Sequence, residues 1–185
     1  MINIIKNRKA GEEFYCKIQE TFNKERPNMW TDWKYVTKKA GDFIWFHYYD
    51  RTTSWDADNR QYDMLNIQIE NTIGREINLV IKISNWEQKK DVLYKVFNEL
   101  SIIAKINGIN LVEPKTYHTG NSSTVAIVKD AFLSDKEDNF DFNSFMNILY
   151  KVEKTISDYV DKREKDGKMP GRAMYGRKKT VCTEQ

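Results

Sequence analysis

The sequence is poor in residues that form cross-links and in long apolar segments. Its 185 residues include two cysteines, Cys16 and Cys182, and neither belongs to a Cys-x-x-Cys or Cys/His cluster. Two isolated thiols do not make a disulfide framework, so we expect both to be reduced. No segment approaches the ~18 consecutive apolar residues of a membrane span, and the N-terminus lacks the apolar stretch of a secretion signal. We therefore expect a cytoplasmic protein with no membrane partner.

Signatures of catalysis are also missing. The sequence has no phosphate-binding glycine loop, no dinucleotide fingerprint, no zinc-protease motif and no nucleophile elbow. Of its two histidines, His47 lies in an aromatic segment that favours a structural role, and His118 is expected at an exposed hairpin end. A calcium loop counted from Asp56 would need Gly and Glu where the chain has Gln61 and Ile67. We expect no metal and no cofactor, and the sequence favours a non-enzymatic protein.

The composition is that of one folded domain with a basic end. Hydrophobic residues make up 40% of the chain and charged residues 31%, which suits a globular protein. The net charge is +3, but the last 24 residues hold eight Lys and Arg against three Asp and Glu, so the remainder is slightly acidic. We predict one domain over residues 1–163 and a flexible basic tail over residues 164–185.

Three segments have the apolar spacing of amphipathic helices. The first extends from about Lys9 to Arg26. The second follows the Ser-x-x-Glu pattern of a capping box at Ser84 and ends at Asn107-Gly108, where Ile109 folds back on the last turn. The third begins at Asn139 or Asp141 and reaches about residue 163.

The segments between these helices have strand patterns. Residues 42–50 are bulky and apolar on both faces, whereas residues 65–69 and 77–83 alternate with one apolar face and form a hairpin. After the second helix, a strand opens at Leu111-Val112, and residues 115–119 and 124–129 form a second hairpin. Pro114 limits the strand at Leu111 to an edge or ends it. Residues 28–41 are expected to be irregular and residues 51–61 to form a polar loop.

These elements predict an α+β fold. Their order is α-β-β-β-α-β-β-α, which suits a single antiparallel sheet of about five strands with helices packed on one face. This order resembles that of type III secretion chaperone-like domains and of small bacterial immunity proteins. The resemblance implies a bacterial protein that binds another protein, such as a toxin or an effector. The basic tail departs from the acidic character of such chaperones.

The same order also resembles the core of PD-(D/E)xK nucleases. Such enzymes hold a metal with strand carboxylates, and a nearby Lys steadies the attacking water. Lys82 would be that Lys and Asp63 the first acid, but Val80 stands where the second acid belongs. A divergent nuclease or nucleic-acid-binding protein is therefore the alternative function.

The partner-binding candidates come from the polar loop. Trp55 lies beside Asp56, Asp58 and Arg60, and a loop Trp with a charged rim is typical of an interface anchor. The alternative is that Trp55 folds back onto the core. His118 completes this candidate set.

The basic tail holds a second set of candidates. Its Arg172, Arg177, Lys178 and Lys179 can contact phosphates or an acidic partner, or can simply be solvated. The main hypothesis is a non-enzymatic protein-binding domain, and self-association into a homodimer is left open.

Overall fold

The computed structural model describes residues 8–25, 32–38, 41–56, 61–71, 77–84, 90–118, 122–134 and 139–166. The tail candidates Arg172, Arg177, Lys178 and Lys179 lie outside this part of the chain. Within it, three helices and six strands follow one another in the order α1 Arg8–Glu25, β1 Asp32–Lys38, β2 Gly41–Asp56, β3 Gln61–Asn71, β4 Asn78–Ser84, α2 Lys90–Ile106, β5 Leu111–Val112, β6 Ser123–Val128 and α3 Phe142–Lys165.

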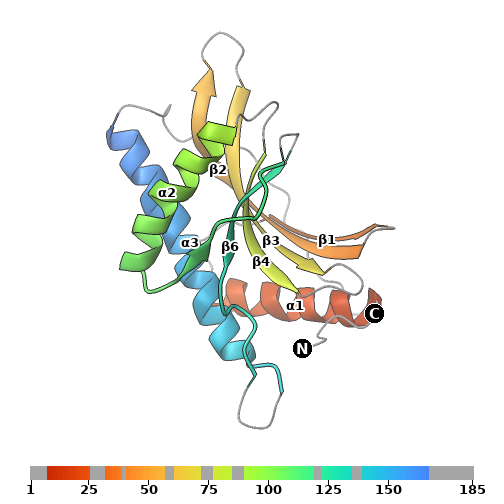
Figure 1. Cartoon of the computed structure of the whole chain (residues 1–185). Helices are drawn as coiled ribbons and strands as arrows, with labels where there is room; N and C mark the ends of the chain where they lie inside the picture. Colours follow the sequence, from red (N-terminus) through yellow and green to blue (C-terminus); the bar gives the residue numbers. More distant parts are fainter. Residues whose placement is uncertain are drawn as a thin grey trace.

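All six strands form one sheet with the spatial order β1-β2-β3-β4-β6-β5, and every neighbouring pair is antiparallel. The expected α+β class, with an antiparallel sheet and three helices, is confirmed. The expected strand order is not, because four strands rather than three precede α2. Figure 1 shows α2 and α3 side by side along the sheet, while α1 lies near β1 and β2.

Three local predictions were wrong. Residues 32–38, expected to be irregular, form β1 and pair with β2 from Asp32↔His47 to Lys38↔Gly41. Residues 51–56, expected in a loop, extend β2. Residues 115–118 are not a strand, because β5 already ends at Val112, two residues before Pro114. The position of Pro114 at an edge strand agrees with its missing backbone donor.

The hairpin of β3 and β4 forms the centre of the core. Its alternating residues Leu65, Ile67 and Ile69 pair in register with Ile83, Ile81 and Leu79, and all six side chains are buried. The α2 stripe covers the same interior, with Leu93, Val96, Leu100, Ile103 and Ala104 buried. Buried residues of all three helices belong to this one hydrophobic cluster. The prediction that these apolar faces share an interior is confirmed.

An aromatic group closes the core where α1 meets the start of α3. The ring of Phe132 stacks on that of Phe145 at 5.1 Å between centroids. Phe14 of α1 meets Phe140 and Phe145 at centroid distances of 5.6 and 5.7 Å. Such ring contacts add to the stabilisation from area burial alone, so they fix α1 against α3.

Both ends of the helical layer have defined caps. Asp141 caps α3, because its Oδ1 accepts a hydrogen bond from the Ser144 backbone N–H at 3.0 Å. At the end of α2, Gly108 has φ +71° and the Ile109 N–H donates to the Ala104 carbonyl at 3.0 Å. This is the left-handed stop expected at Asn107-Gly108, which satisfies carbonyls that the helix leaves unpaired.

The expectation of two reduced thiols is wrong for Cys16, which is disulfide-bonded and lies half-buried on α1. A disulfide is favoured by an oxidising environment. Cys182, the other cysteine of the sequence, lies outside the described residues.

The helix α3 carries a buried acid, and its ionisation makes stability depend on pH. Glu153 is buried, and this burial raises its pKa from 4.5 to about 7. The folded state therefore binds more protons than the unfolded state between those two values. Its free energy of unfolding should fall as pH rises through this window, and the full penalty is present above pH 7.

We predict that Glu153→Gln raises the free energy of unfolding at pH 8 by on the order of 2 kcal/mol, since one pKa unit corresponds to about 1.4 kcal/mol. Below the ordinary pKa of Glu, the variant should match the wild type. Urea unfolding across this pH range measures the difference. Glu20→Gln, at an exposed position of α1, is the matched control. A Glu153→Gln effect that does not change with pH would contradict the prediction.

Candidate functional site

The structure places the candidate anchor in a strand rather than in a loop. Trp55 and Asp56 are the last two residues of β2, in register with Tyr62 and Gln61 of β3. Thr52 and Thr53 favour extended backbone despite their polarity. Strand β2 therefore continues to Asp56 and forms a long hairpin with β3. Asp58 and Arg60 lie outside the described residues, so the candidate charged rim around Trp55 stays a prediction.

His118 lies near the same end of the sheet as Trp55, but on a different part of it. It is exposed and follows β5, and its carbonyl accepts a hydrogen bond from Ser123 Oγ at 2.6 Å. Ser123 pairs with Ile83 near the end of β4. β3 and β4 separate this point from Trp55 in the strand order, so the structure brings the two candidates to one end of the sheet without joining them.

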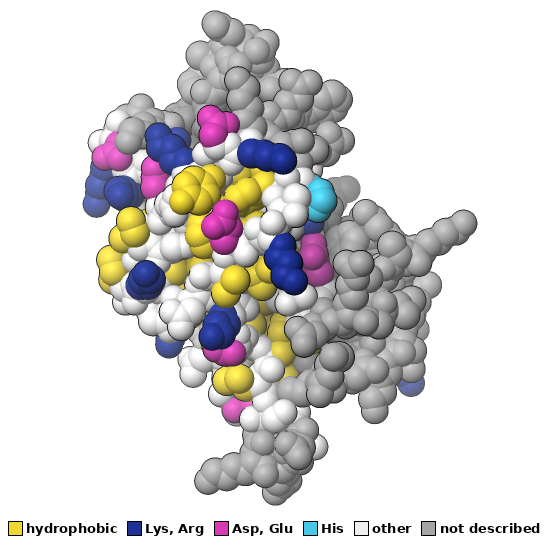
Figure 2. Space-filling view, viewed as in Figure 1, with side chains coloured by type: hydrophobic (Ala, Val, Ile, Leu, Met, Phe, Trp, Pro, Cys, Tyr) yellow, Lys and Arg dark blue, Asp and Glu magenta, His cyan; other side chains and the backbone are white. Residues whose placement is uncertain are grey.

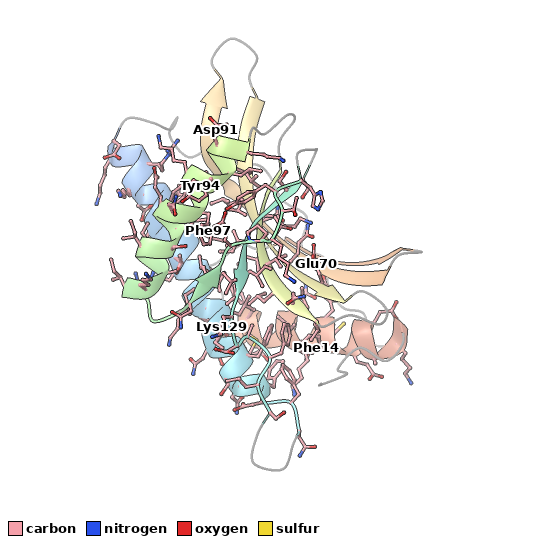
Figure 3. All side chains as sticks on the ribbon, in the orientation of Figure 1. Phe14, Glu70, Asp91, Tyr94, Phe97 and Lys129 are labelled. Carbon is pink, nitrogen blue, oxygen red and sulfur yellow. The ribbon has the colours of Figure 1, made fainter. Side chains whose placement is uncertain are left out.

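Sequence reasoning missed an aromatic patch beside α2, which we call the α2 surface and define as Val92, Tyr94, Glu113 and Tyr117. Tyr94 is 50% exposed and Val92 is also exposed. Figure 3 labels Tyr94 and Phe97 on successive turns of α2, and Figure 2 shows hydrophobic side chains gathered over this region among acidic and basic ones. The sequence signal that could have found it is a Tyr that lies outside the buried stripe of the helix.

The α2 surface includes a polar group in an enclosed position. Burial raises the pKa of Tyr117 above its usual range, and the neighbouring Glu113 carboxylate and Tyr94 reinforce the shift. The Tyr117 hydroxyl is shielded from solvent, and neither it nor Ser101 Oγ finds a hydrogen-bond partner within the described part of the chain. Buried hydroxyls usually have partners, and the Glu113 carboxylate is close enough to the hydroxyl of Tyr117 to raise its pKa.

A second feature lies on the face of the sheet that alternates with the core. We call it the polar row and define it as Asn66, Gln68 and Glu70 of β3 with Lys82 of β4. The alternation predicted one buried face for these strands. Instead Asn66 is fully buried and Gln68 is only 6% exposed, although both belong to the polar half of the pattern. Lys82 Nζ donates to Glu70 Oε1 at 2.8 Å.

The register explains how the row becomes buried. Lys82 lies opposite Asn66, whereas Glu70 lies opposite Asn78, four residues farther along β3. At a strand rise of about 3.3 Å per residue, this offset is roughly 13 Å. The two long side chains must therefore extend toward each other along the strands. Between them lies the register pair Gln68↔Val80, so the ion pair helps to cover that pair.

Gln68 is the unusual member of this row. It is almost fully buried, although its side chain ends in a polar amide. An amide offers two donors and one acceptor group, and leaving them unpaired away from water costs free energy. The polar row thus combines a partly buried ion pair with a buried amide.

The predicted nuclease constellation is not assembled by the strand register. Lys82 is paired with Glu70, whereas Asp63 lies in register with Ser54, beyond the Met64↔Ser84 end of the β3–β4 ladder. Among the described residues, no group of three His, Cys, Asp or Glu side chains could hold a metal ion. His47, expected to be structural, takes the register position opposite Asn66.

Comparisons with known proteins found no relative of this chain. No family model, no curated protein and no solved structure matches the chain. The resemblance to type III secretion chaperone-like domains and to immunity proteins therefore stays a prediction. No helix in the described part of the chain is long and apolar enough to cross a membrane.

The polar row makes a prediction for stability. The Lys82→Met and Glu70→Gln changes, singly and together, should give a coupling energy of about 1 kcal/mol in a double-mutant cycle measured by urea unfolding. The coupling should persist at high salt, because the pair is largely shielded from solvent. The exposed pair Lys154–Asp158 of α3 is the control and should lose its coupling. Coupling near zero for Lys82 and Glu70 would contradict the assigned geometry.

Proposed function

We propose that this chain is a non-enzymatic protein-binding domain that uses the α2 surface as its contact site. The observation that carries the proposal is the exposure of Tyr94 and Val92 on a helix whose opposite stripe is fully committed to the core. An exposed aromatic side chain on a rigid helix loses little conformational freedom on binding. Tyr is also one of the residues that most often supply binding energy at interfaces.

The surroundings of Tyr94 also suit a protein partner. Lys90, Asp91 and Lys95 are exposed near it on α2, and Glu113 adds a carboxylate beside Tyr117. An apolar centre with a charged rim is the usual arrangement of such interfaces.

An immunity or chaperone-like role fits this type of surface. Proteins of those classes act by covering part of a toxin or an effector, and such coverage needs a rigid surface rather than reactive groups. The caps at both ends of the helical layer supply this rigidity. The bacterial origin, the partner class and the role itself are parts of the proposal that rest on the resemblance in element order.

The proposal predicts that Tyr94→Lys weakens binding of the partner about 30-fold, the loss expected for a central aromatic contact. Partners captured from a bacterial lysate at low salt would first be purified. Each would then be titrated against the full chain by calorimetry. Ile106→Lys is the control, because Ile106 is 80% exposed on the same helix but outside the α2 surface. Repeated recovery of the chain alone, or equal affinity for Tyr94→Lys, would contradict the proposal.

A divergent nuclease is the competing function, and the observation that favours it is the Lys82–Glu70 contact on neighbouring strands. We expect no cleavage of plasmid DNA or RNA by the chain with Mg²⁺ or Mn²⁺. We also expect no salt-sensitive binding of either nucleic acid, which is the mark of phosphate contacts. Metal-dependent cleavage that disappears in Lys82→Met would replace the protein-binding proposal with the nuclease.

A further inference from the structure

The helix α2 concentrates the exposed apolar surface of the described chain. Six large hydrophobic side chains are exposed among the described residues, and four of them lie on this one helix: Val92, Tyr94, Ile102 and Ile106. Tyr94 is 50% exposed and Ile102 is 61% exposed. Apolar side chains that gather on the surface of a folded domain commonly mark a site that another molecule covers. The pattern of residues along α2 indicates which molecule this is.

Five residues of α2 form a symmetric pattern, which we call the symmetric face and define as Asp91, Tyr94, Asn98, Ile102 and Lys105. Successive members are three or four residues apart, so all five lie on one side of the helix. All five are exposed, and none belongs to the buried stripe. Asn98 is the midpoint of the pattern. Tyr94 and Ile102 lie four residues before and after it, and Asp91 and Lys105 lie seven residues before and after it.

The charges at the two ends of this face are complementary to each other. Asp91 lies in the first turn of α2 and Lys105 in the last turn, about 21 Å apart at the rise of an α-helix. No ion pair among the described residues includes either of them. An antiparallel second copy of α2, centred on Asn98, would place each Asp91 beside the Lys105 of the other copy. A parallel copy would instead place like charges together.

The apolar residues obey the same symmetry. In the antiparallel arrangement each Tyr94 meets the Ile102 of the other copy. A two-fold interface requires this reciprocity, because each residue contacts a second residue and is contacted by it in turn. The symmetric face is therefore complementary in both charge and polarity to a second copy of itself.

We propose that the symmetric face is a homodimer interface, in which the α2 helices of two copies pack antiparallel about a two-fold axis at Asn98. The two Asn98 amides donate to and accept from each other and set the register, as a polar residue does in paired helices. Tyr94 and Ile102 supply the apolar contacts, and the two pairs of Asp91 with Lys105 close the ends. One helix face is a small interface, so we expect a dissociation constant on the order of 10 μM.

The dimer also regulates the α2 surface, because Tyr94 belongs to both. Figure 3 shows Asp91 and Tyr94 following one another along α2. The second copy covers Tyr94 until another protein displaces it. This regulation rests on the proposed function, whereas the dimer itself does not. Ile102 belongs to the symmetric face alone, so a change at Ile102 separates self-association from binding of another protein.

Sedimentation equilibrium of the full chain tests the proposal. The wild type should show a concentration-dependent equilibrium between monomer and dimer. Ile102→Lys and Tyr94→Lys should each weaken association about tenfold or more, as expected for central apolar contacts. Leu133→Lys is the control, because Leu133 is 43% exposed but lies outside α2, and it should associate like the wild type. Ile102→Lys should still bind a captured partner at least as tightly as the wild type does.

Charge exchange tests the antiparallel arrangement. Asp91→Lys and Lys105→Asp should each weaken association, since each brings like charges together at both ends of the interface. A mixture of these two single variants should associate again, and far-UV circular dichroism checks that each stays folded. The variant that carries both changes should also regain association, which a parallel pair of helices would not allow.

The outcomes separate this proposal from the proposed function. A wild-type chain that stays monomeric up to about a millimolar overturns the dimer, and so does wild-type association of the Ile102→Lys variant. Failure of both the mixture and the doubly changed variant to associate overturns it as well. A monomer that binds a captured partner through Tyr94 removes the dimer alone and shows that another protein covers α2. A dimer that captures no partner supports the dimer and removes the proposed function alone.

Discussion

The antiparallel pairing of β3 with β4 is the constraint on which the rest of the structure depends. The ladder aligns Ile67 with Ile81 and Gln68 with Val80, so one register determines both faces of the sheet at once. A shift by one residue would exchange those faces and would place the polar row in the hydrophobic core. The apolar face receives the helices, and the other face brings Lys82 to Glu70. Core packing and the polar row therefore depend on the same hydrogen-bonded ladder.

The helices that pack on this central hairpin also carry the exposed surface to which we assign partner binding. The buried stripe of α2 determines which side of the helix faces solvent, and Tyr94 lies on the solvent-facing side. The stop at Gly108 sets where α2 ends and the chain turns toward β5. Asn107 then ties the turn to α3, because its Nδ2 donates to Asp158 Oδ2 at 3.0 Å. The exposed Tyr94 thus belongs to a helix that is held by its buried stripe and by a defined C-terminal end.

Sequence patterns predicted the parts of the fold that depend on neighbours along the chain. The alternation around Ile67, the cap at Asp141 and the stop at Gly108 are local signals, and the structure confirms all three. The strand at residues 32–38 was not predicted, although Trp33 and Tyr35 favour strands. Its formation depends on pairing with β2, and that pairing cannot be read from the local sequence. The polar row could not be predicted, since contact between Glu70 and Lys82 depends on the register of a hairpin and on what shields it. The exposure of Tyr94 likewise depends on how α2 lies on the sheet.

Native-state hydrogen exchange measures the central claim most directly, because it reports the free energy needed to open each backbone amide. The account predicts that the amides of Leu65–Ile69 and of Leu79–Ile83 exchange only through global unfolding and are the slowest in the chain. Protection should include the polar positions Asn66 and Gln68 as fully as the apolar ones between them. Exchange of these two strands at a lower opening free energy than α3 would contradict the claim that the β3–β4 ladder is the centre of the fold.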